Sequence, residues 1–317
     1  MDLLEIKNLN INFNLEDGIY PAVHDVSLSI KKASTHALVG ESGCGKSITA
    51  MSILQLLPKT ATITRGQILF NGEDLLTLPL NEIQKIRGSK IALIPQDPLT
   101  SLNPLFTIGN QLLEIIELHQ ELDKKRAKEK AIEALSMVKI PAPERCFNSY
   151  PHELSGGMKQ RAVIAMALAC DAELIIADEP TTALDVTIQV QIMNLLDDIK
   201  KNHGTSILLI SHDLALVSQY SDEISVMYSG RIVEHSPSTD FFIMTNHPYS
   251  TALLRALPSN KFKKLATIKG QPPNLKQKID GCKFHPRCGY CLPNICNNKI
   301  PELKEIGPNH FSACHLN

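Results

Sequence analysis

The sequence lacks a surplus of charge of either sign. Its 317 residues include 32 lysines and arginines and 33 aspartates and glutamates, which leaves a formal net charge of -1. Without a net positive field, the chain as a whole does not attract nucleic acid or anionic lipid. We therefore expect no nucleic-acid partner.

Long apolar runs are also missing. No uninterrupted hydrophobic stretch reaches the roughly 18 residues expected of a membrane-spanning helix. The opening residues, MDLLEIKNLNINFNLEDG, do not show the basic, apolar and small-residue order of a secretory signal. We therefore expect a cytosolic protein. Its composition is that of an ordinary globular chain.

Cysteine is sparse over most of the chain. Cys44, Cys146 and Cys170 are scattered, and each is expected to serve ordinary packing. A disulfide framework is not expected in a reducing compartment. The remaining five cysteines all lie in the last 36 residues: Cys282, Cys288, Cys291, Cys296 and Cys314. This asymmetry marks the tail as a site of local chemistry.

The hydrophobic pattern indicates alternating strands and helices. Alternating segments predict strands over residues 2–40, and apolar faces between charged residues predict helices over 107–150. Further along, helices are expected at 160–171 and 186–201, and wholly apolar strands at 173–178 and 206–210. Apolar strands between helices favour an α/β fold with a parallel sheet covered on both faces. The Pro- and Lys-rich stretch 257–281 is typical of an ordered linker or extended arm.

A phosphate-binding loop is predicted at GESGCGKS, residues 40–47, which fits the pattern G-x-x-x-x-G-K-[ST]. A short strand, THALVG, precedes it, and a helix is expected over KSITAMSILQLL up to Pro58. Glycines let the loop wrap so that backbone N–H groups face phosphates. Lys46 is expected to reach the β- and γ-phosphates and Ser47 to ligate Mg²⁺. The candidate nucleotide-binding residues here are Gly40, Glu41, Ser42, Gly43, Cys44, Gly45, Lys46, Ser47 and Ile48.

Two acidic residues follow the apolar strand in ELIIADEP, residues 173–180. Asp178, at the end of the strand, is placed to give a carboxylate to the metal. Glu179 is then placed to polarise the attacking water. Such a pair on its own is often a solvated turn, and the glycine loop is what favours the catalytic interpretation.

The stretch LSGGMKQR, residues 154–161, resembles the signature motif of ABC ATPases. Its small residues precede a helix expected to start near Met158, so Ser155, Gly156 and Gly157 would form a second phosphate-binding helix N-terminus. The resemblance implies a P-loop NTPase (RecA-like) core with an antiparallel β subdomain and a helical subdomain at about 97–160, within an ATPase domain at 1–256. It also implies that two ATPase domains associate head to tail and sandwich each ATP.

Other positions resemble the motifs of that family. Gln96, after the strand IALIP, looks like the glutamine that contacts Mg²⁺ or water and reports to membrane domains. Asp185 resembles the aspartate that contacts the opposite subunit, and His212 the histidine that contacts the γ-phosphate. The resemblance also implies an aromatic residue stacked on adenine, for which Phe13 is chosen by position and Tyr20 is the alternative.

The C-terminal part resembles the extension of dipeptide and oligopeptide importer ATPases, including nickel-import relatives. The similarity lies in HPYSTALLRALP, residues 247–258, and GCKFHPRCGYC, residues 281–291. It implies an extension at 257–317 and a peripheral protein on the cytoplasmic face of the bacterial inner membrane. The partners implied are a second homologous ATPase subunit, two transmembrane permeases and an extracytoplasmic peptide-binding protein.

The subfamily resemblance further implies a four-iron four-sulfur cluster, with ligands matching Cys282, Cys288, Cys296 and Cys314. Seven residues separate Cys288 from Cys296, about one more than the family usually shows, and Cys291 is an alternative ligand. Thiolates at this density also suit zinc. Structural zinc and unliganded thiols therefore remain alternatives, and the role could be redox or structural.

The function expected is ATP hydrolysis that powers a peptide importer. One alternative is an ABC ATPase acting outside transport, on ribosomes, DNA or cluster assembly. Another is a metal-sensing tail on an inactive ATPase scaffold, against which the presence of Lys46, Asp178, Glu179 and His212 counts. The sequence does not choose between dipeptide, oligopeptide, nickel and antimicrobial peptide as cargo.

Overall fold

A computed structural model describes residues 2–182, 184–257 and 268–317, and gives only the backbone of Leu99. The chain divides into two compact units. The first holds residues 1–31, 35–76 and 210–317, and the second holds 32–34 and 77–209. Residues 210–317 belong to the same unit as the first strands. The predicted domain limits at 256 and 257 stay a prediction.

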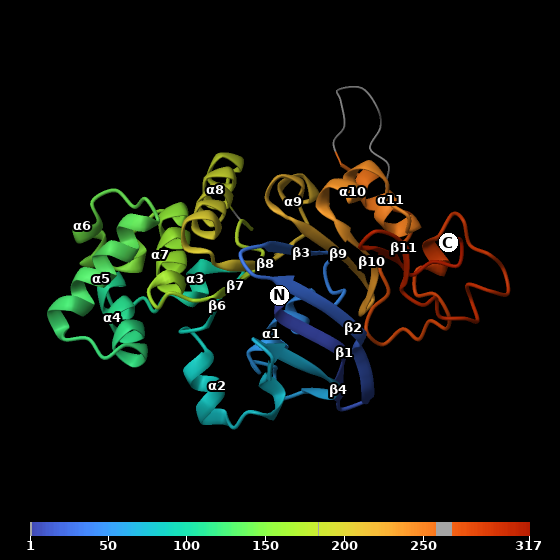
Figure 1. Cartoon of the computed structure of the whole chain (residues 1–317), viewed down its shortest axis with the longest axis horizontal. Coiled ribbons are helices and arrows are strands. Elements are labelled where there is room, and N and C mark those ends of the chain that lie inside the picture. The colour runs from blue at the N-terminus through green and yellow to red at the C-terminus, as the bar shows by residue number, and fades with distance from the viewer. Residues whose placement is uncertain (1, 183, 258–267) are drawn as a thin grey trace. The chain divides into compact units, whose positions relative to one another are not determined.

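An antiparallel sheet in the first unit has the strand order β2-β1-β4-β5. The strands are β1 (Asp2–Leu15), β2 (Gly18–Lys31), β4 (Ala61–Phe70) and β5 (Glu73–Asp74). β1 and β2 form a long hairpin that is visible in blue in Figure 1. Leu4, Ile6, Leu9 and Ile11 of β1 are fully buried, so one face of the hairpin contributes to the core.

A second group of strands in the first unit has the order β11-β12-β10-β9-β3. They are β3 (Thr35–Val39), β9 (Glu223–Tyr228), β10 (Arg231–Pro237), β11 (Lys304–Gly307) and β12 (His310–Ser312). β3 pairs with β9 in parallel, and the others pair antiparallel. The end of the chain thus adds strands to the sheet that carries the glycine loop.

The helices of the first unit are short. They are α1 (Lys46–Ile53), α9 (Leu214–Tyr220), α10 (Ser238–Ile243) and α11 (Pro248–Arg255), with a 3-10 turn at His285–Arg287. A further 3-10 turn, Leu75–Thr77, begins in this unit, and its last residue belongs to the second. α1 ends before the predicted limit at Pro58, because Gln55 takes a left-handed backbone conformation with φ of 50°. Tyr249 and Phe241 in these helices are fully buried and form part of the core.

The second unit contains β6 (Ile91–Ile94), β7 (Leu174–Asp178) and the first residues of β8 (Ser206–Ser211). β6 and β7 pair in parallel, and every residue of β7 is buried. β7 and β8 are wholly buried strands, which confirms the strands predicted at 173–178 and 206–210.

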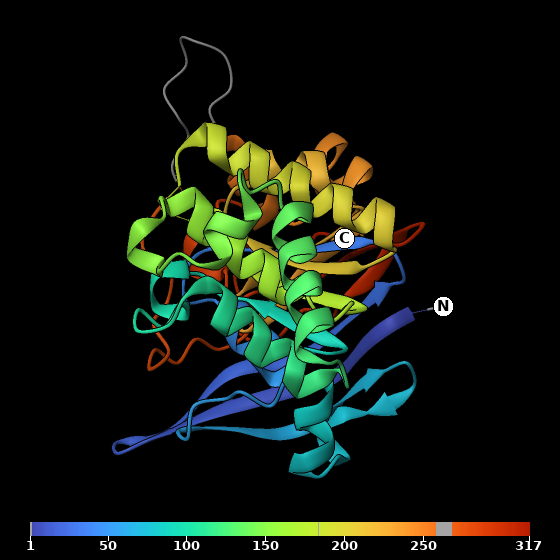
Figure 2. The ribbon, with the colours of Figure 1, turned by 90° about the vertical axis from the view of Figure 1, so that its left-hand side faces the viewer.

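Helices make up most of the second unit, as Figures 1 and 2 show for α4–α7. The predicted helical stretch over 107–150 contains α4 (Ile108–His119), α5 (Lys124–Met137) and α6 (Pro143–Phe147). They pack around buried residues such as Leu112, Ile116 and Leu135. The remaining helices are α2 (Leu80–Ile86), α3 (Pro98–Ser101), α7 (Gly156–Leu168) and α8 (Val186–His203), with a 3-10 turn at Pro151–Glu153.

No described helix has both the length and the apolar content needed to cross a bilayer. The predicted linker at 257–281 lies in part outside the described residues. From Gln271 to Asp280 the chain has no helix or strand and is mostly exposed, as expected of an extended arm.

Candidate active site

The glycine loop in the first unit joins β3 to α1. All five residues of β3 are buried, which fixes the point where the loop begins. Gly40 has φ of 154°, and a Cβ at this position would lie 2.2 Å from the carbonyl oxygen of Met227. Only glycine allows this close approach, so the first glycine of the motif is required by the packing of β9 beside the loop.

Lys46 lies inside the loop that it terminates. Its side chain is 5% exposed, and its ammonium group donates hydrogen bonds to the carbonyl oxygens of Gly40 at 2.8 Å and Glu41 at 3.1 Å. Ser47 and Ile48 follow in the first turn of α1 and are half-buried. The structure thus places the positive charge at the turn predicted to bind phosphate.

Cys44 packs in the interior beneath the loop. Burial raises the pKa of its thiol, and the nearby Lys46 charge offsets this only in part. The thiol is therefore protonated at neutral pH, and its role is packing, as expected.

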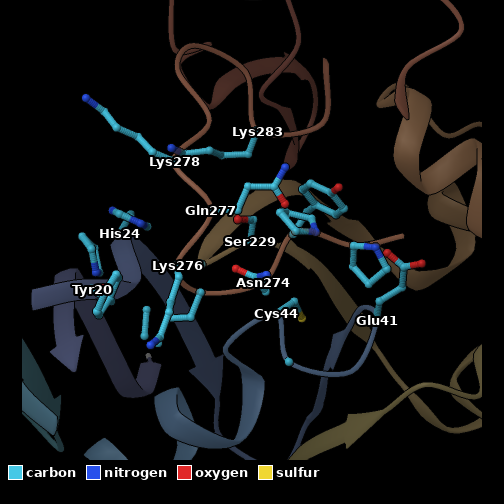
Figure 3. A pocket seen from close by; sticks show the side chains of 18 of the residues that line it. Tyr20, His24, Glu41, Cys44, Ser229, Asn274, Lys276, Gln277, Lys278 and Lys283 are labelled. Carbon is cyan, nitrogen blue, oxygen red and sulfur yellow. The ribbon is translucent and has the colours of Figure 1, made fainter. Parts of the chain in front are cut away.

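A cavity of about 410 Å³ opens beside the loop. Its walls include the loop at Glu41–Cys44, the hairpin at Tyr20, the turn at Tyr228–Gly230 and the arm at Asn274–Lys278, and Figure 3 shows side chains from each. The arm is tied to the hairpin by an ion pair between Lys276 and Asp17. The C-terminal segment therefore forms one wall of the space next to the glycine loop.

Tyr20, rather than Phe13, lines this cavity. The two residues face each other in the β1–β2 pairing, and both are half-buried. The ammonium group of Lys276 lies 5.6 Å from the centre of the Tyr20 ring. Because Phe13 and Tyr20 are cross-strand neighbours, their positions in the sequence could not show which of them lines the cavity.

In the second unit, β7 delivers the two acidic residues. Asp178 ends the strand and is 5% exposed, whereas Glu179 follows with φ of 48° and is half-buried. The carboxylate of Glu179 accepts hydrogen bonds from Gln96 Nε2 at 2.9 Å and from Thr182 Oγ1 at 3.0 Å. Gln96 follows β6, and Glu179 follows β7. The two residues lie close together because the neighbouring parallel strands end at the same edge of the sheet.

The signature stretch forms a helix N-terminus in the second unit. Ser155 caps α7, and its Oγ accepts a hydrogen bond from the backbone N–H of Met158 at 3.3 Å. The helix begins at Gly156, two residues before the predicted start. Ser155 and Gly156 are exposed, so this N-terminus is accessible to an anion.

Asp185 and His212 occupy the ends of other elements. Asp185 in the second unit caps α8, and its carboxylate accepts a hydrogen bond from the N–H of Ile188 at 3.0 Å. His212 in the first unit follows β8 and is exposed. Capping explains an aspartate at position 185 without any partner chain, and its predicted contact with a second subunit stays a prediction.

Four cysteines of the tail lie close enough together for three of them to affect the pKa of Cys282. Burial, with smaller contributions from the nearby Cys296, Cys314 and Cys288, raises the pKa of Cys282 to about 11. The N–H of Cys282 also donates to the carbonyl oxygen of Cys296 at 2.7 Å. Among the described residues, however, no three His, Cys, Asp or Glu side chains form a group able to hold a metal ion. The expected metal centre, with Cys291 as alternative ligand, gains no support from this arrangement.

The sequence of residues 23–182 matches the family described as ABC transporter. The chain belongs to the ABC transporter family. This ABC protein also matches, over residues 233–296, the family described as the C-terminal region of oligopeptide and dipeptide transporters. As an ABC ATPase, the chain binds and hydrolyses ATP.

Relatives of this ABC ATPase span nearly its whole length. The oligopeptide transport ATP-binding protein OppD of Escherichia coli is 44% identical over 314 residues, which cover 98% of this chain and 92% of that protein. The dipeptide transport ATP-binding protein DppD of Bacillus subtilis is 43% identical over 320 residues, covering 99% and 94%.

Solved structures confirm the predicted P-loop NTPase fold. A dimeric post-hydrolysis state of the ATP-binding cassette MJ0796, bound to ADP and phosphate, is similar with a TM-score of 0.67 and 28% identity. It covers 74% of this chain and 98% of its own. The cbiO1 protein of Clostridium perfringens is similar with a TM-score of 0.66 and 28% identity, covering 76% and 91%.

Two residues of this ABC ATPase lie against the loop and were not predicted. Tyr249 Oη accepts a hydrogen bond from the N–H of Glu41 at 2.9 Å, and Arg287 pairs with the Glu41 carboxylate. The segments HPY and HPR, which carry these residues, served in the sequence only to identify the extension. Their separation from Glu41 by more than two hundred positions left no local signal of the contact.

Proposed function

We propose that this chain is the ATP-hydrolysing subunit of a bacterial importer of dipeptides or oligopeptides. The observation that carries the proposal is similarity over nearly the full length, extension included, to ATP-binding proteins named for oligopeptide and dipeptide transport. The match at 233–296 counts against an ABC ATPase acting outside transport. Nickel and antimicrobial peptides remain alternative cargoes for an importer of this family.

The roles proposed for these residues toward Mg²⁺–ATP rest on the motifs that the chain shares with ABC ATPases. The backbone from Gly40 to Ser47 surrounds the phosphates, and Lys46 neutralises the β- and γ-phosphates. The hydroxyl of Ser47 and the buried carboxylate of Asp178 are hard oxygen donors, which fit Mg²⁺. The metal supplies charge neutralisation at the phosphate oxygens.

Glu179 orients and polarises the attacking water, and the hydrogen bond from Gln96 fixes the direction of its carboxylate. His212 contacts the γ-phosphate. The side chains of Phe13 or Tyr20 stack on the base. These roles are proposed on the motifs that the chain shares with ABC ATPases.

A second ATPase subunit completes the site. We propose that Ser155, Gly156 and Gly157 at the N-terminus of α7 contact the γ-phosphate of ATP held by the partner, which is a different but homologous chain. Exposure of Ser155 and Gly156 supports this assignment, because a phosphate of another chain can reach them. Asp185 would contact the same partner.

Two permeases would dock on the second unit. Leu105 and Phe106 are 79% and 50% exposed, although both are large and apolar. Tyr150 is also exposed, and its segment adjoins theirs, because the N–H of Ile108 donates to the carbonyl oxygen of Ser149 at 2.9 Å. Through this surface the chain would lie peripherally on the cytoplasmic face of the inner membrane and respond to an extracytoplasmic peptide-binding protein.

Reconstitution tests this proposal. The chain, its partner ATPase, both permeases and the binding protein are placed in proteoliposomes, and ATP turnover is measured with and without peptide. Peptide-stimulated turnover and ATP-dependent uptake are expected, both abolished by Glu179→Gln. Turnover without permease association would favour the alternative outside transport, and stimulation by nickel alone would change the cargo.

A finer proposal is that the tail thiols of Cys282, Cys288, Cys296 and Cys314 hold a four-iron four-sulfur cluster. Thiolate chemistry suits iron and zinc, and neighbouring tail thiols contribute to the raised pKa of Cys282, Cys288 and Cys314. The described residues do not form a ready group of three ligands, so no step of the ATPase reaction is assigned to the cluster. Anaerobically purified protein should be brown and contain iron and acid-labile sulfide; colourless, iron-free protein would reject the assignment.

A further inference from the structure

Glu41, the second residue of the glycine loop, is anchored through each of its polar groups. Its N–H donates to Tyr249 Oη at 2.9 Å, and its carbonyl oxygen accepts from Lys46 Nζ at 3.1 Å. Its carboxylate accepts two hydrogen bonds from Arg287, with Nη1 to Oε2 at 2.6 Å and Nη2 to Oε1 at 3.0 Å. Two of these three anchors come from the C-terminal part of the chain.

Arg287 is itself held on every side. Its Nε donates to the carbonyl oxygen of Lys269 at 2.9 Å, and Nη2 also donates to that of Gly270 at 3.3 Å. Nη1 lies 3.4 Å from the hydroxyl of Tyr228, whose ring packs against Tyr249 and Phe284. The side chain is only 6% exposed. A guanidinium fixed in this way makes a planar two-bond contact that a lysine cannot reproduce.

The charge of this pair bears directly on nucleotide binding. The Glu41 carboxylate belongs to a loop whose backbone N–H groups serve to attract a highly charged triphosphate. An unpaired carboxylate in this half-buried place would repel that anion, and screening by solvent would be incomplete. Arg287 neutralises the Glu41 carboxylate. It also fixes the position of Glu41, whose carbonyl oxygen accepts a hydrogen bond from Lys46.

We propose that Arg287 is a positioning residue for the ATP site: it neutralises and fixes Glu41, so that tight ATP binding requires the C-terminal extension. This inference rests on ATP binding at Gly40–Ser47. It does not depend on which cargo the transporter carries.

The test uses the full-length chain and compares single variants of Arg287 and Glu41 with the double variant. Arg287→Met is compared with Arg287→Lys, with Glu41→Gln and with the double variant Glu41→Gln/Arg287→Met. The control is Arg255→Met, which makes the same chemical change at an exposed position of α11. For each protein, the Kd of ATP is measured at low and high salt, together with the melting temperature without nucleotide.

Arg287→Met should weaken ATP binding roughly tenfold or more, within the usual range of coupling between sites, and the loss should shrink at high salt. Arg287→Lys should fall between it and the wild type. The double variant should regain most of the ATP affinity, because it has no unpaired carboxylate, even where its melting temperature stays low. Arg255→Met should bind ATP as the wild type does.

Wild-type affinity in Arg287→Met would overturn the proposal. So would a double variant that binds ATP as weakly as Arg287→Met, since the arginine would then act only through folding. If Arg287→Met does not fold, equal ATP affinity of Arg287→Lys and wild type would be the overturning result. Failure of the wild type itself to bind ATP would refute the proposed function instead, so the two failures are distinguishable.

Discussion

The side-chain amide of Gln96 donates a hydrogen bond to the carboxylate of Glu179, with 2.9 Å between Nε2 and Oε2. The same carboxylate oxygen accepts a second hydrogen bond from Thr182 Oγ1 at 3.0 Å. Both donors lie in the second unit, at the ends of the strands and turns that position the acid. These two hydrogen bonds therefore orient the Glu179 carboxylate without the help of a bound nucleotide.

The first prediction concerns this carboxylate. Glu179→Gln should leave ATP binding intact, because the amide keeps the size and one acceptor oxygen of the side chain. Turnover should fall by about a hundredfold or more, since general-base assistance is worth roughly 10²–10⁴-fold. Phosphate release and the Kd of ATP are the measurements, and a closed dimer with the partner subunit should accumulate.

Glu173→Gln is the matched control, because this acid pairs with Lys90 at the surface near the start of β7. Its turnover should equal that of the wild type. Normal turnover in Glu179→Gln would remove the carboxylate from the mechanism and leave the binding residues unaffected.

A second prediction compares two glycines of the same loop. A Cβ on Gly40 would lie 2.2 Å from the carbonyl oxygen of Met227, whereas a Cβ on Gly43 would have no atom within 4 Å. Gly43 has φ of 78°, so Gly43→Ala should cost only the strain of a left-handed residue, about 1–2 kcal/mol. Gly40→Ala adds a backbone collision and should cost about 3 kcal/mol or more.

Urea unfolding of both variants measures the difference in free energy of unfolding. Gly40→Ala should also lose ATP affinity to a much larger extent, because β9 must move away from the loop. Equal stability of the two variants would show that the loop adapts and that the close approach of β9 is not required.

Local sequence was sufficient to predict the elements that carry the site. The strand before Gly40, the helix from Lys46 and the acids after β7 each follow from patterns within about ten residues. The contact between Gln96 and Glu179 was not predicted. It depends on β6 and β7 being neighbours in the sheet, which no local pattern specifies.

Contacts between distant segments were not predictable in the same way. Arg287 and Glu41 are 246 positions apart, and nothing near either residue specifies the other. Whether Phe13 or Tyr20 contacts the base stays a prediction. The two are direct cross-strand neighbours, and Tyr20 is the one that lines the cavity. The predicted end of α1 was too late. Helices often end at a glycine in the left-handed conformation, but here a glutamine, Gln55, adopts it.

A third prediction concerns the aromatic residue that contacts the base. Tyr20 lines the cavity beside the glycine loop, so Tyr20→Ala should weaken ATP binding by roughly 5- to 150-fold, the range for loss of one stacked base at about 1–3 kcal/mol. Tyr20→Phe keeps the ring and should bind ATP almost normally. Binding of inorganic triphosphate, which has no base, should be unchanged in both variants.

Phe13→Ala is the comparison for Tyr20→Ala, because the two residues pair across the hairpin and both changes disturb it. A larger loss of ATP affinity in Phe13→Ala, with triphosphate binding preserved, would return the base contact to the residue chosen from the sequence.

The last prediction is a pH dependence that arises from His247. This histidine is 1% exposed, and burial lowers the pKa of its ring to about 4, although a hydrogen bond with the backbone of Ala313 acts the other way. Its Nδ1 accepts the N–H of Tyr249 at the start of α11, which requires the neutral ring. The backbone N–H of His247 donates to the carboxylate of Glu234 at 3.1 Å, so the surroundings of the residue also contain a buried acid.

Because the unfolded chain protonates this residue near pH 6.5, its contribution to stability is complete above that value. The contribution is lost as the pH falls toward about 4, by about 3 kcal/mol at most. His247→Asn keeps an acceptor for the helix cap and removes the titration. The gap in unfolding free energy between wild type and variant should therefore narrow from pH 7 to pH 4.5.

Burial also lowers the pKa of His24 and His235 to about 4, but both remain in the variant and cancel in the comparison. Urea unfolding at pH 7, 6, 5 and 4.5 measures the gap. A gap that stays constant over this range would mean that His247 takes up its proton in the folded state as readily as in the unfolded one, and that α11 does not depend on the neutral ring.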